Sequence, residues 1–239
     1  MIPRSATSSL VKSASSKPPE SEDNATVSQK VYQELESQLL SGRLLPNTQL
    51  SLRTLAISLN TSMQPIRDAV SRLVGLSALK LAPGRSIRVP VLSRNDADDI
   101  WSMRLLLEGE AAARFAAQLP GDKATRLYDH TRALRQHRFG VDLEPTIQAL
   151  MRWNMDLVRG SGSPLLIDIV SRLYLRYAPF LAQALSGGMP HDEGFLQFTL
   201  HIQDELILAI KRGDVVAARS LRCADLLSFQ RYIYGRYGW

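Results

Sequence analysis

Apolar residues recur with helical spacing near the start of the chain. Val31, Leu35 and Leu39 lie four residues apart, which places them on one face of a helix. Gly42 follows the last of them and favours the end of that helix. The pattern therefore predicts an amphipathic helix that starts near Thr26.

Two shorter amphipathic segments follow, separated by a three-residue polar turn. Ser51 precedes the first segment and Ser62 the second, and serine is favoured as an N-cap because its hydroxyl can accept a hydrogen bond from an early backbone N–H. The outer face of the second segment carries Gln64 and Arg67. A short helix, a tight turn and a second helix with a polar outer face predict a helix-turn-helix.

The spacing of the apolar residues then changes from one typical of helices to one typical of β-strands. Residues 79–82 and 87–91 are short β-prone runs, joined by a turn over 83–86 that contains proline and glycine. This pattern predicts a hairpin that acts as the wing of a winged helix-turn-helix. Its basic residues, Arg85 and Arg88, would face phosphates or a groove of DNA.

From residue 94 onward the chain shows only amphipathic helical segments. Glycine and proline mark the breaks between them. Six helices are predicted, over about residues 94–119, 122–139, 144–160, 164–186, 191–212 and 214–237. Helices joined by short connections pack as antiparallel neighbours, so we expect an all-α bundle that can enclose a cavity.

The predicted fold is therefore mainly α, with an N-terminal winged helix-turn-helix followed by an antiparallel helical bundle. Residues 1–25 are rich in Ser, Ala, Lys, Pro and Glu without periodicity, and predict a disordered arm. Residues 26–92 are predicted to form the DNA-binding domain. Residues 93–239 are predicted to form an all-helical domain, for which a family resemblance implies effector binding and dimerisation.

The positive charge lies in the first part of the chain. The net charge is +6, and residues 1–92 hold 11 basic and 6 acidic residues, whereas residues 93–239 hold 18 and 17. A single cysteine excludes an intramolecular disulfide framework. No apolar run approaches the roughly 18 residues of a membrane span, so we expect a cytoplasmic protein without a membrane partner.

The expected partner of the basic winged helix is double-stranded DNA. Gln64 and Arg67 lie where a recognition helix reaches base edges, and these residue types prefer adenine and guanine respectively. Arg53 and Ser62 would lie nearer the phosphate backbone. With the two wing arginines they form the predicted DNA-binding set. The alternative is that this polar face is only solvated.

Several motifs resemble a known family of regulators. Residues 42–46 (GRLLP), 50–56 (LSLRTLA) and 62–70 (SMQPIRDAV) resemble the winged-helix domain of GntR-type bacterial transcription regulators. Residues 103–112 (MRLLLEGEAA) resemble the opening helix of the FadR-type effector domain. The resemblance implies a homodimer, most often a repressor, that reads a palindromic operator and responds to a small molecule. One departure is Met63, where the family usually has a basic residue, and it implies an atypical operator.

The resemblance also implies a divalent metal held by an Asp and three His. The corresponding positions in this sequence are Leu150, Asn154, Gln203 and Asp225, none of which matches. A neutral amide is a poor ligand for zinc or nickel, so we expect no metal and no cofactor.

Three of these four replacements are polar and are predicted to line an effector cavity. Asn154, Gln203 and Asp225 would bind the effector there, unless they bond one another or point to solvent. By the same resemblance, Arg104 lies where it can neutralise the carboxylate of an organic-acid effector. The alternative for Arg104 is an ion pair with Glu108, four residues further along its helix.

A competing hypothesis is a metal-dependent or acid–base enzyme in the helical domain. It requires a converging set of ligands or carboxylates, and the four expected metal positions are lost. The sequence contains no Gly-rich phosphate loop, nucleophile elbow or HExxH motif. We therefore expect a regulator and not an enzyme.

Overall fold

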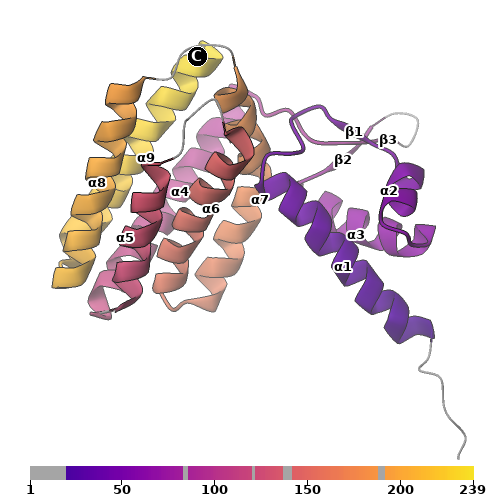
Figure 1. Cartoon of the computed structure of the whole chain (residues 1–239), viewed down its shortest axis with the longest axis horizontal. Coiled ribbons are helices and arrows are strands. Elements are labelled where there is room, and N and C mark those ends of the chain that lie inside the picture. The colour runs from indigo at the N-terminus through magenta and orange to yellow at the C-terminus, as the bar shows by residue number, and fades with distance from the viewer. Residues whose placement is uncertain (1–19, 83–85, 120–121, 137–141, 188–191) are drawn as a thin grey trace, which may run out of the picture.

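The structure is a computed structural model that describes residues 20–82, 86–119, 122–136, 142–187 and 192–239. Its N-terminal part contains α1 (Glu20–Leu40), β1 (Gln49–Leu50), α2 (Leu52–Ser58), α3 (Met63–Gly75), β2 (Lys80–Ala82) and β3 (Ser86–Arg88). Its C-terminal part contains α4 (Arg94–Ala117), α5 (Asp122–Leu134), α6 (Leu143–Gly160), α7 (Pro164–Ser186), α8 (Glu193–Arg212) and α9 (Val215–Tyr237). Figure 1 shows the two parts, a winged helix and a bundle. The predicted fold class is confirmed.

The N-terminal part is a winged helix with a three-stranded sheet. Leu35 and Leu39 of α1 pack with Ile66 and Leu73 of α3 in one fully buried core. The strand order is β1-β3-β2, and both pairs are antiparallel. The sequence predicted β2 and β3 but not β1, because β1 has only two residues and shows no alternation of its own. Its pairing with β3 gives it the extended form.

The two predicted serine caps differ in the structure. The hydroxyl of Ser51 accepts a hydrogen bond from the Thr54 backbone N–H at 3.4 Å and caps α2 as expected. Ser62 has the extended backbone of an N-cap residue, but its side chain makes no capping bond. The exposed hydroxyl of Ser62 is therefore not used to hold the start of α3.

Helix α1 begins earlier than the sequence pattern indicates. It extends to Glu20, so the last six residues of the segment predicted to be a disordered arm are helical. Residues 1–19 lie outside the described residues.

The six predicted helices of the C-terminal part all form, as α4 to α9. Their ends agree with the predicted ends to within a few residues, and the end predicted for α5, at 139, falls among residues the structure does not describe. Helix α9 packs along α4 and α8, and α6 packs against α5 and α7 (Figure 1). Trp101, Phe115 and Trp153 are buried in the core that these helices share. In the part of the chain that the structure describes, no helix is both long and apolar enough to cross a membrane.

Helix α7 joins the bundle to the winged helix. Leu175 on α7 is 2% exposed and belongs to the core of the winged helix, and α1 lies beside α7 in Figure 1. Gly42 has a left-handed φ of 74°, and a Cβ at this position would lie 2.6 Å from the Cβ of Ala182 on α7. Arg43 and Glu144 add an ion pair at 2.6 Å across the same joint. The backbone at Gly42 is therefore closely fitted to the bundle.

Candidate functional site

The predicted DNA-reading residues lie on α2 and the start of α3. Arg53, Ser62, Gln64 and Arg67 all have exposed side chains. The side-chain amide of Gln64 donates a hydrogen bond to Asp68 at 2.8 Å, one turn along the same helix. The four residues are therefore exposed on two consecutive helices, and their contacts with DNA stay a prediction.

Other arginines of the winged helix are held by intramolecular contacts. Arg88 donates to Gln49 at 2.7 Å and to both the carbonyl and the side chain of Asn47 at 3.2 Å. Arg72 on α3 donates to Gln29 at 2.8 Å. Arg88 therefore fixes the sheet in this state, while Arg85 falls outside the described residues.

Arg53 and Arg67, the other described arginines of the predicted DNA-binding set, differ from Arg88 in their contacts. Among the described residues, neither Arg53 nor Arg67 has a hydrogen bond or an ion pair. An unpaired, exposed guanidinium binds phosphate or guanine without first breaking an internal contact.

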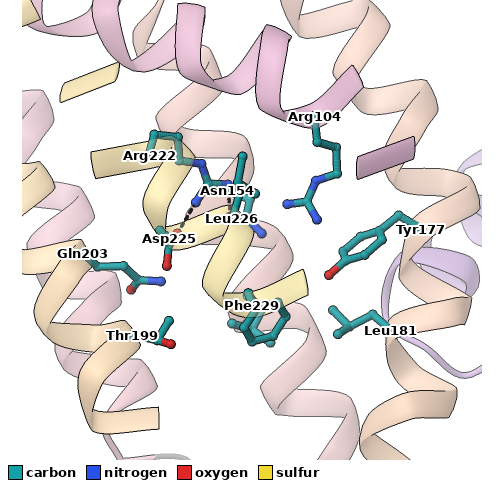
Figure 2. Close-up of a pocket in the computed structure, with 11 residues that line it drawn as sticks. Arg104, Asn154, Tyr177, Leu181, Thr199, Gln203, Arg222, Asp225, Leu226 and Phe229 are labelled. Carbon is teal, nitrogen blue, oxygen red and sulfur yellow. Dashed lines mark hydrogen bonds and ion pairs between the residues drawn. The ribbon is translucent and has the colours of Figure 1, made fainter. Parts of the chain in front are cut away.

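A pocket lies inside the bundle, between five of its helices. Its empty volume is about 330 Å³, including the opening to solvent. Helices α4, α6, α7, α8 and α9 provide the lining, which includes four residues that the sequence analysis assigned to effector binding, namely Arg104, Asn154, Gln203 and Asp225 (Figure 2). The rest of the lining is Leu150, Tyr177, Leu181, Thr199, Arg222, Leu226 and Phe229.

Two arginines and two carboxylates form a buried network at one side of this pocket. Arg104 and Glu108 pair at 2.6 Å, and Glu108 also pairs with Arg222 of α9. Arg222 donates to Asp225 at 2.5 Å and to the side-chain oxygen of Asn154 at 2.6 Å. Because each of the four charged side chains is at most 5% exposed, the charges are compensated by one another and not by water.

The pKa values of the two carboxyl groups in the network are shifted in opposite directions. Burial alone would raise the pKa of Glu108, but the guanidinium groups of Arg104 and Arg222 outweigh burial and hold the pKa below its ordinary value. Burial raises the pKa of Asp225 to about 6, because Arg222 and Arg104 offset the desolvation only in part. Glu108 is therefore the permanent anion of the network.

Aromatic rings surround the guanidinium of Arg104. Its central carbon lies 4.2 Å from the ring centre of Tyr177, 4.6 Å from that of Trp101 and 5.2 Å from that of Tyr174. Cation–π contacts of this kind stabilise a buried cation. With Glu108 they fix Arg104 in one position at the pocket wall.

Several polar atoms of the pocket have no hydrogen-bond partner among the described residues. They are Nη1 of Arg104, the hydroxyls of Tyr177 and Thr199, Oε1 of Gln203, and Oδ1 of Asp225. All are buried, and leaving such an atom unsatisfied costs about 1–3 kcal/mol. The pocket therefore offers polar atoms that a polar molecule or ordered water can satisfy.

Comparison with known proteins shows to which protein family a chain with these two domains belongs. Residues 27–89 match the family model described as bacterial regulatory proteins of the gntR family, and residues 99–225 match the FCD domain. The HTH-type transcriptional regulator McbR of Escherichia coli K12 is 30% identical over 151 residues, which are 63% of this chain and 68% of that protein. The chain belongs to the GntR family of bacterial regulatory proteins.

Solved structures of GntR-family regulators share the whole fold. The structure of E. coli McbR/YncC has a TM-score of 0.79 at 25% identity, covering 88% of this chain and 98% of McbR. A GntR regulator from Rhodococcus sp. RHA1 has a TM-score of 0.71 at 17% identity, with the same coverage of both chains, and supports the fold alone. The chain is thus a transcriptional regulator with a DNA-binding and an effector-binding domain, and the comparisons give no support to the competing enzyme hypothesis.

The residues at the metal positions of the family do not fit a metal in this GntR protein. Leu150, Asn154, Gln203 and Asp225 do line one pocket, but the guanidinium of Arg222 bonds to two of them. A cation is thus already bound to two of the oxygen atoms at these positions, and the Leu150 side chain offers no ligand atom. No cluster of three or more His, Cys, Asp or Glu suited to a metal occurs among the described residues.

Three polar residues of the pocket were not predicted from the sequence, namely Tyr177, Thr199 and Arg222. The signal for Arg222 was its spacing, since it precedes Asp225 by three residues and therefore shares its helix face. Arg104 forms the ion pair with Glu108 that was the alternative interpretation, while its Nη1 has no hydrogen-bond partner among the described residues. Its contact with an effector stays a prediction.

Proposed function

We propose that this regulator is a homodimeric repressor that binds a palindromic operator and is controlled by a small carboxylate in the bundle pocket. The observation that carries the DNA-binding part is the pair of exposed guanidinium groups of Arg53 and Arg67 on adjacent helices, which have no partner among the described residues. A symmetric dimer presents two such surfaces to two half-sites.

Each DNA-binding residue has a separate role in this proposal. Arg67 and Gln64 read base edges in the major groove, and Gln64 exchanges its bond with Asp68 for a bond to a base. Arg53 and Ser62 contact phosphates and fix the register. In the wing, Arg85 and Arg88 add contacts to the backbone or the groove, and Arg88 does so after releasing its bonds to the sheet.

In the effector site, Arg104 binds the carboxylate through Nη1, the nitrogen that has no internal partner. Gln203 and Asp225 complete the site from the opposite wall. Asn154 contributes indirectly, because its side-chain oxygen is already bonded to Arg222 and so holds that guanidinium in place.

Helix α7 connects the effector pocket to the DNA-binding domain. Tyr177 and Leu181 line the pocket, while Leu175 on the same helix is buried in the core of the winged helix. Pro179 lies between these residues and removes one backbone hydrogen bond of α7, the bond to the carbonyl of Leu175. A ligand that moves the pocket face of α7 therefore moves a residue of the DNA-binding core, which changes how the two winged helices are placed.

The DNA-binding proposal is tested with Arg67→Ala and a matched control, Arg72→Ala. Both arginines are exposed on α3, but Arg72 is bonded to Gln29 and lies over the ring of Tyr32 at 4.0 Å. The probe is the DNA upstream of the protein's own gene, with sequences selected from a random pool as a second probe. We expect Arg67→Ala to weaken specific binding by at least tenfold, since a good base contact contributes about 1–3 kcal/mol.

The control variant should bind within about threefold of the parent protein. The affinity of the parent should also fall steeply as salt rises, since phosphate contacts release counterions. Equal losses in both variants, or binding without sequence preference, would refute the assigned surface. Sedimentation equilibrium tests the dimer, which requires twice the 26.6 kDa mass of the chain.

A further inference from the structure

The two sides of the effector pocket leave different kinds of hydrogen-bonding groups unpaired. On one side the guanidinium of Arg104 and the hydroxyl of Tyr177 point into the space, and the Arg104 nitrogen is a donor only (Figure 2). On the other side are Oδ1 of Asp225 and Oε1 of Gln203, which accept hydrogen bonds, together with the hydroxyl of Thr199, which can accept or donate one. The pocket therefore has a donor wall and an acceptor wall.

Apolar side chains contribute the rest of the lining. They are Leu150, Leu181, Leu226 and Phe229. The volume of about 330 Å³, including the opening, limits the occupant to a small molecule. A ligand that fits has polar groups at two places and a short carbon chain between them.

Arg222 makes the acceptor wall possible. It holds Oδ2 of Asp225 at 2.5 Å, and its other contacts to Glu108 and Asn154 prevent the guanidinium from turning away. This arrangement fixes the carboxylate and leaves Oδ1 without a partner. Arg222 is thus a positioning residue for Asp225.

Compounds with only one polar group match only one wall. A simple carboxylate satisfies Arg104 but brings a negative charge toward Asp225 and leaves Oδ1 facing carbon. A simple amine satisfies Asp225 but brings a positive charge toward Arg104 and Arg222. In either case a buried polar group stays unsatisfied, which weakens binding.

We propose that the effector is a small bifunctional acid, with a carboxylate bound by Arg104 and Tyr177 and a hydrogen-bond donor, an ammonium or a hydroxyl group, bound by Asp225 and Gln203. This inference rests on the proposed function only in that the occupant of the pocket is the effector. Binding itself is measured on the full chain without DNA, so a failure of operator binding does not affect the result.

The test uses six four-carbon compounds, namely butyrate, butylamine, 2-aminobutyrate, 2-hydroxybutyrate, 4-aminobutyrate and 4-hydroxybutyrate. Calorimetric titration at pH 7.5 compares their affinities. At least one bifunctional compound should bind about tenfold more tightly than butyrate and butylamine, which corresponds to about 1.4 kcal/mol. The amino and hydroxy compounds distinguish the two kinds of donor, and the 2- and 4-positions distinguish two spacings. Butyrate binding as tightly as every bifunctional compound, or no binding by any of the six, would overturn the proposal.

Asp225→Asn is the variant that tests the acceptor wall, with Asp204→Asn as its matched control. Asp204 lies beside Gln203 on α8, pairs with Arg135 and does not line the pocket. The preference of the best compound over butyrate should fall at least fivefold in Asp225→Asn and stay unchanged in the control. If Asp225→Asn does not fold, Gln203→Met removes the other acceptor and should reduce the same preference. An unchanged preference in the folded variant would contradict the assignment.

Discussion

Glu108 and Glu110 offer a direct test of how burial changes the energetic role of an ion pair. Each carboxylate is paired with one arginine on its own helix α4 and one on α9. Glu108 is 0% exposed, whereas the side chain of Glu110 is 33% exposed. The two sites therefore share the same chemistry and topology but differ in solvation.

Replacing Glu108 with Gln leaves two buried guanidinium groups without their shared anion. Breaking a buried pair from one side costs about 3–5 kcal/mol, so we expect Glu108→Gln to lower the free energy of unfolding by that amount. For a chain of this size the loss corresponds to a fall in Tm of roughly 10 °C. Glu110→Gln breaks a solvated pair and should cost about 0–1 kcal/mol.

Tryptophan fluorescence during urea unfolding measures this difference in the correct domain. All three tryptophans of the chain, Trp101, Trp153 and Trp239, lie in the bundle part, so the signal does not report the winged helix. Urea is preferred because guanidinium chloride screens ion pairs. Equal destabilisation by the two substitutions, or a loss below 1 kcal/mol for Glu108→Gln, would refute the view that burial makes the Glu108 network essential.

Three further predictions concern pH, the domain joint and the shared core. Because the folded pKa of Asp225, about 6, lies above the unfolded value of about 3.9, its protonation stabilises the fold below about pH 4, and about 3 kcal/mol is lost as the pH rises through 6. Urea unfolding of the parent and Asp225→Asn from pH 4 to 7 should show that difference, and parallel curves would contradict it. Gly42→Ala places a Cβ 2.6 Å from an α7 side chain, at a residue with a left-handed φ, so it should speed proteolytic cleavage between the domains. Gly75→Ala is the control and should not change the cleavage rate, because nothing lies within 4 Å of the added Cβ. Leu175→Ala should lower the free energy of unfolding by about 2–5 kcal/mol, because it opens a cavity. Leu208 is 40% exposed, so Leu208→Ala should lower it by less than 1 kcal/mol. Similar losses for the two variants in calorimetry would argue against Leu175 as a core residue.

The local pattern of apolar residues was sufficient to predict most of the helices and strands. The six bundle helices follow from apolar spacing and from the glycines and prolines between them, because both signals act within a few residues of the chain. Strand β1 did not follow from the sequence, because two residues become a strand only when β3 lies beside them. The side-chain cap at Ser62 was also expected and did not form, although Ser51 in an equivalent position makes its bond.

The sequence determined some features of the functional sites, and only the tertiary structure determined the others. The sequence determined the two-part organisation, the basic winged helix with Arg53 and Arg67, and the loss of the metal ligands of the family. Only the tertiary structure decided that Arg222 is bonded to two of the replacement residues. It also decided that Arg88 bonds to Gln49 of β1, whereas Arg67 has no partner in the part of the chain that the structure describes. The physical reason is that charge and periodicity are properties of the chain. The partner of a buried charge comes from another helix, and only packing determines which one it is.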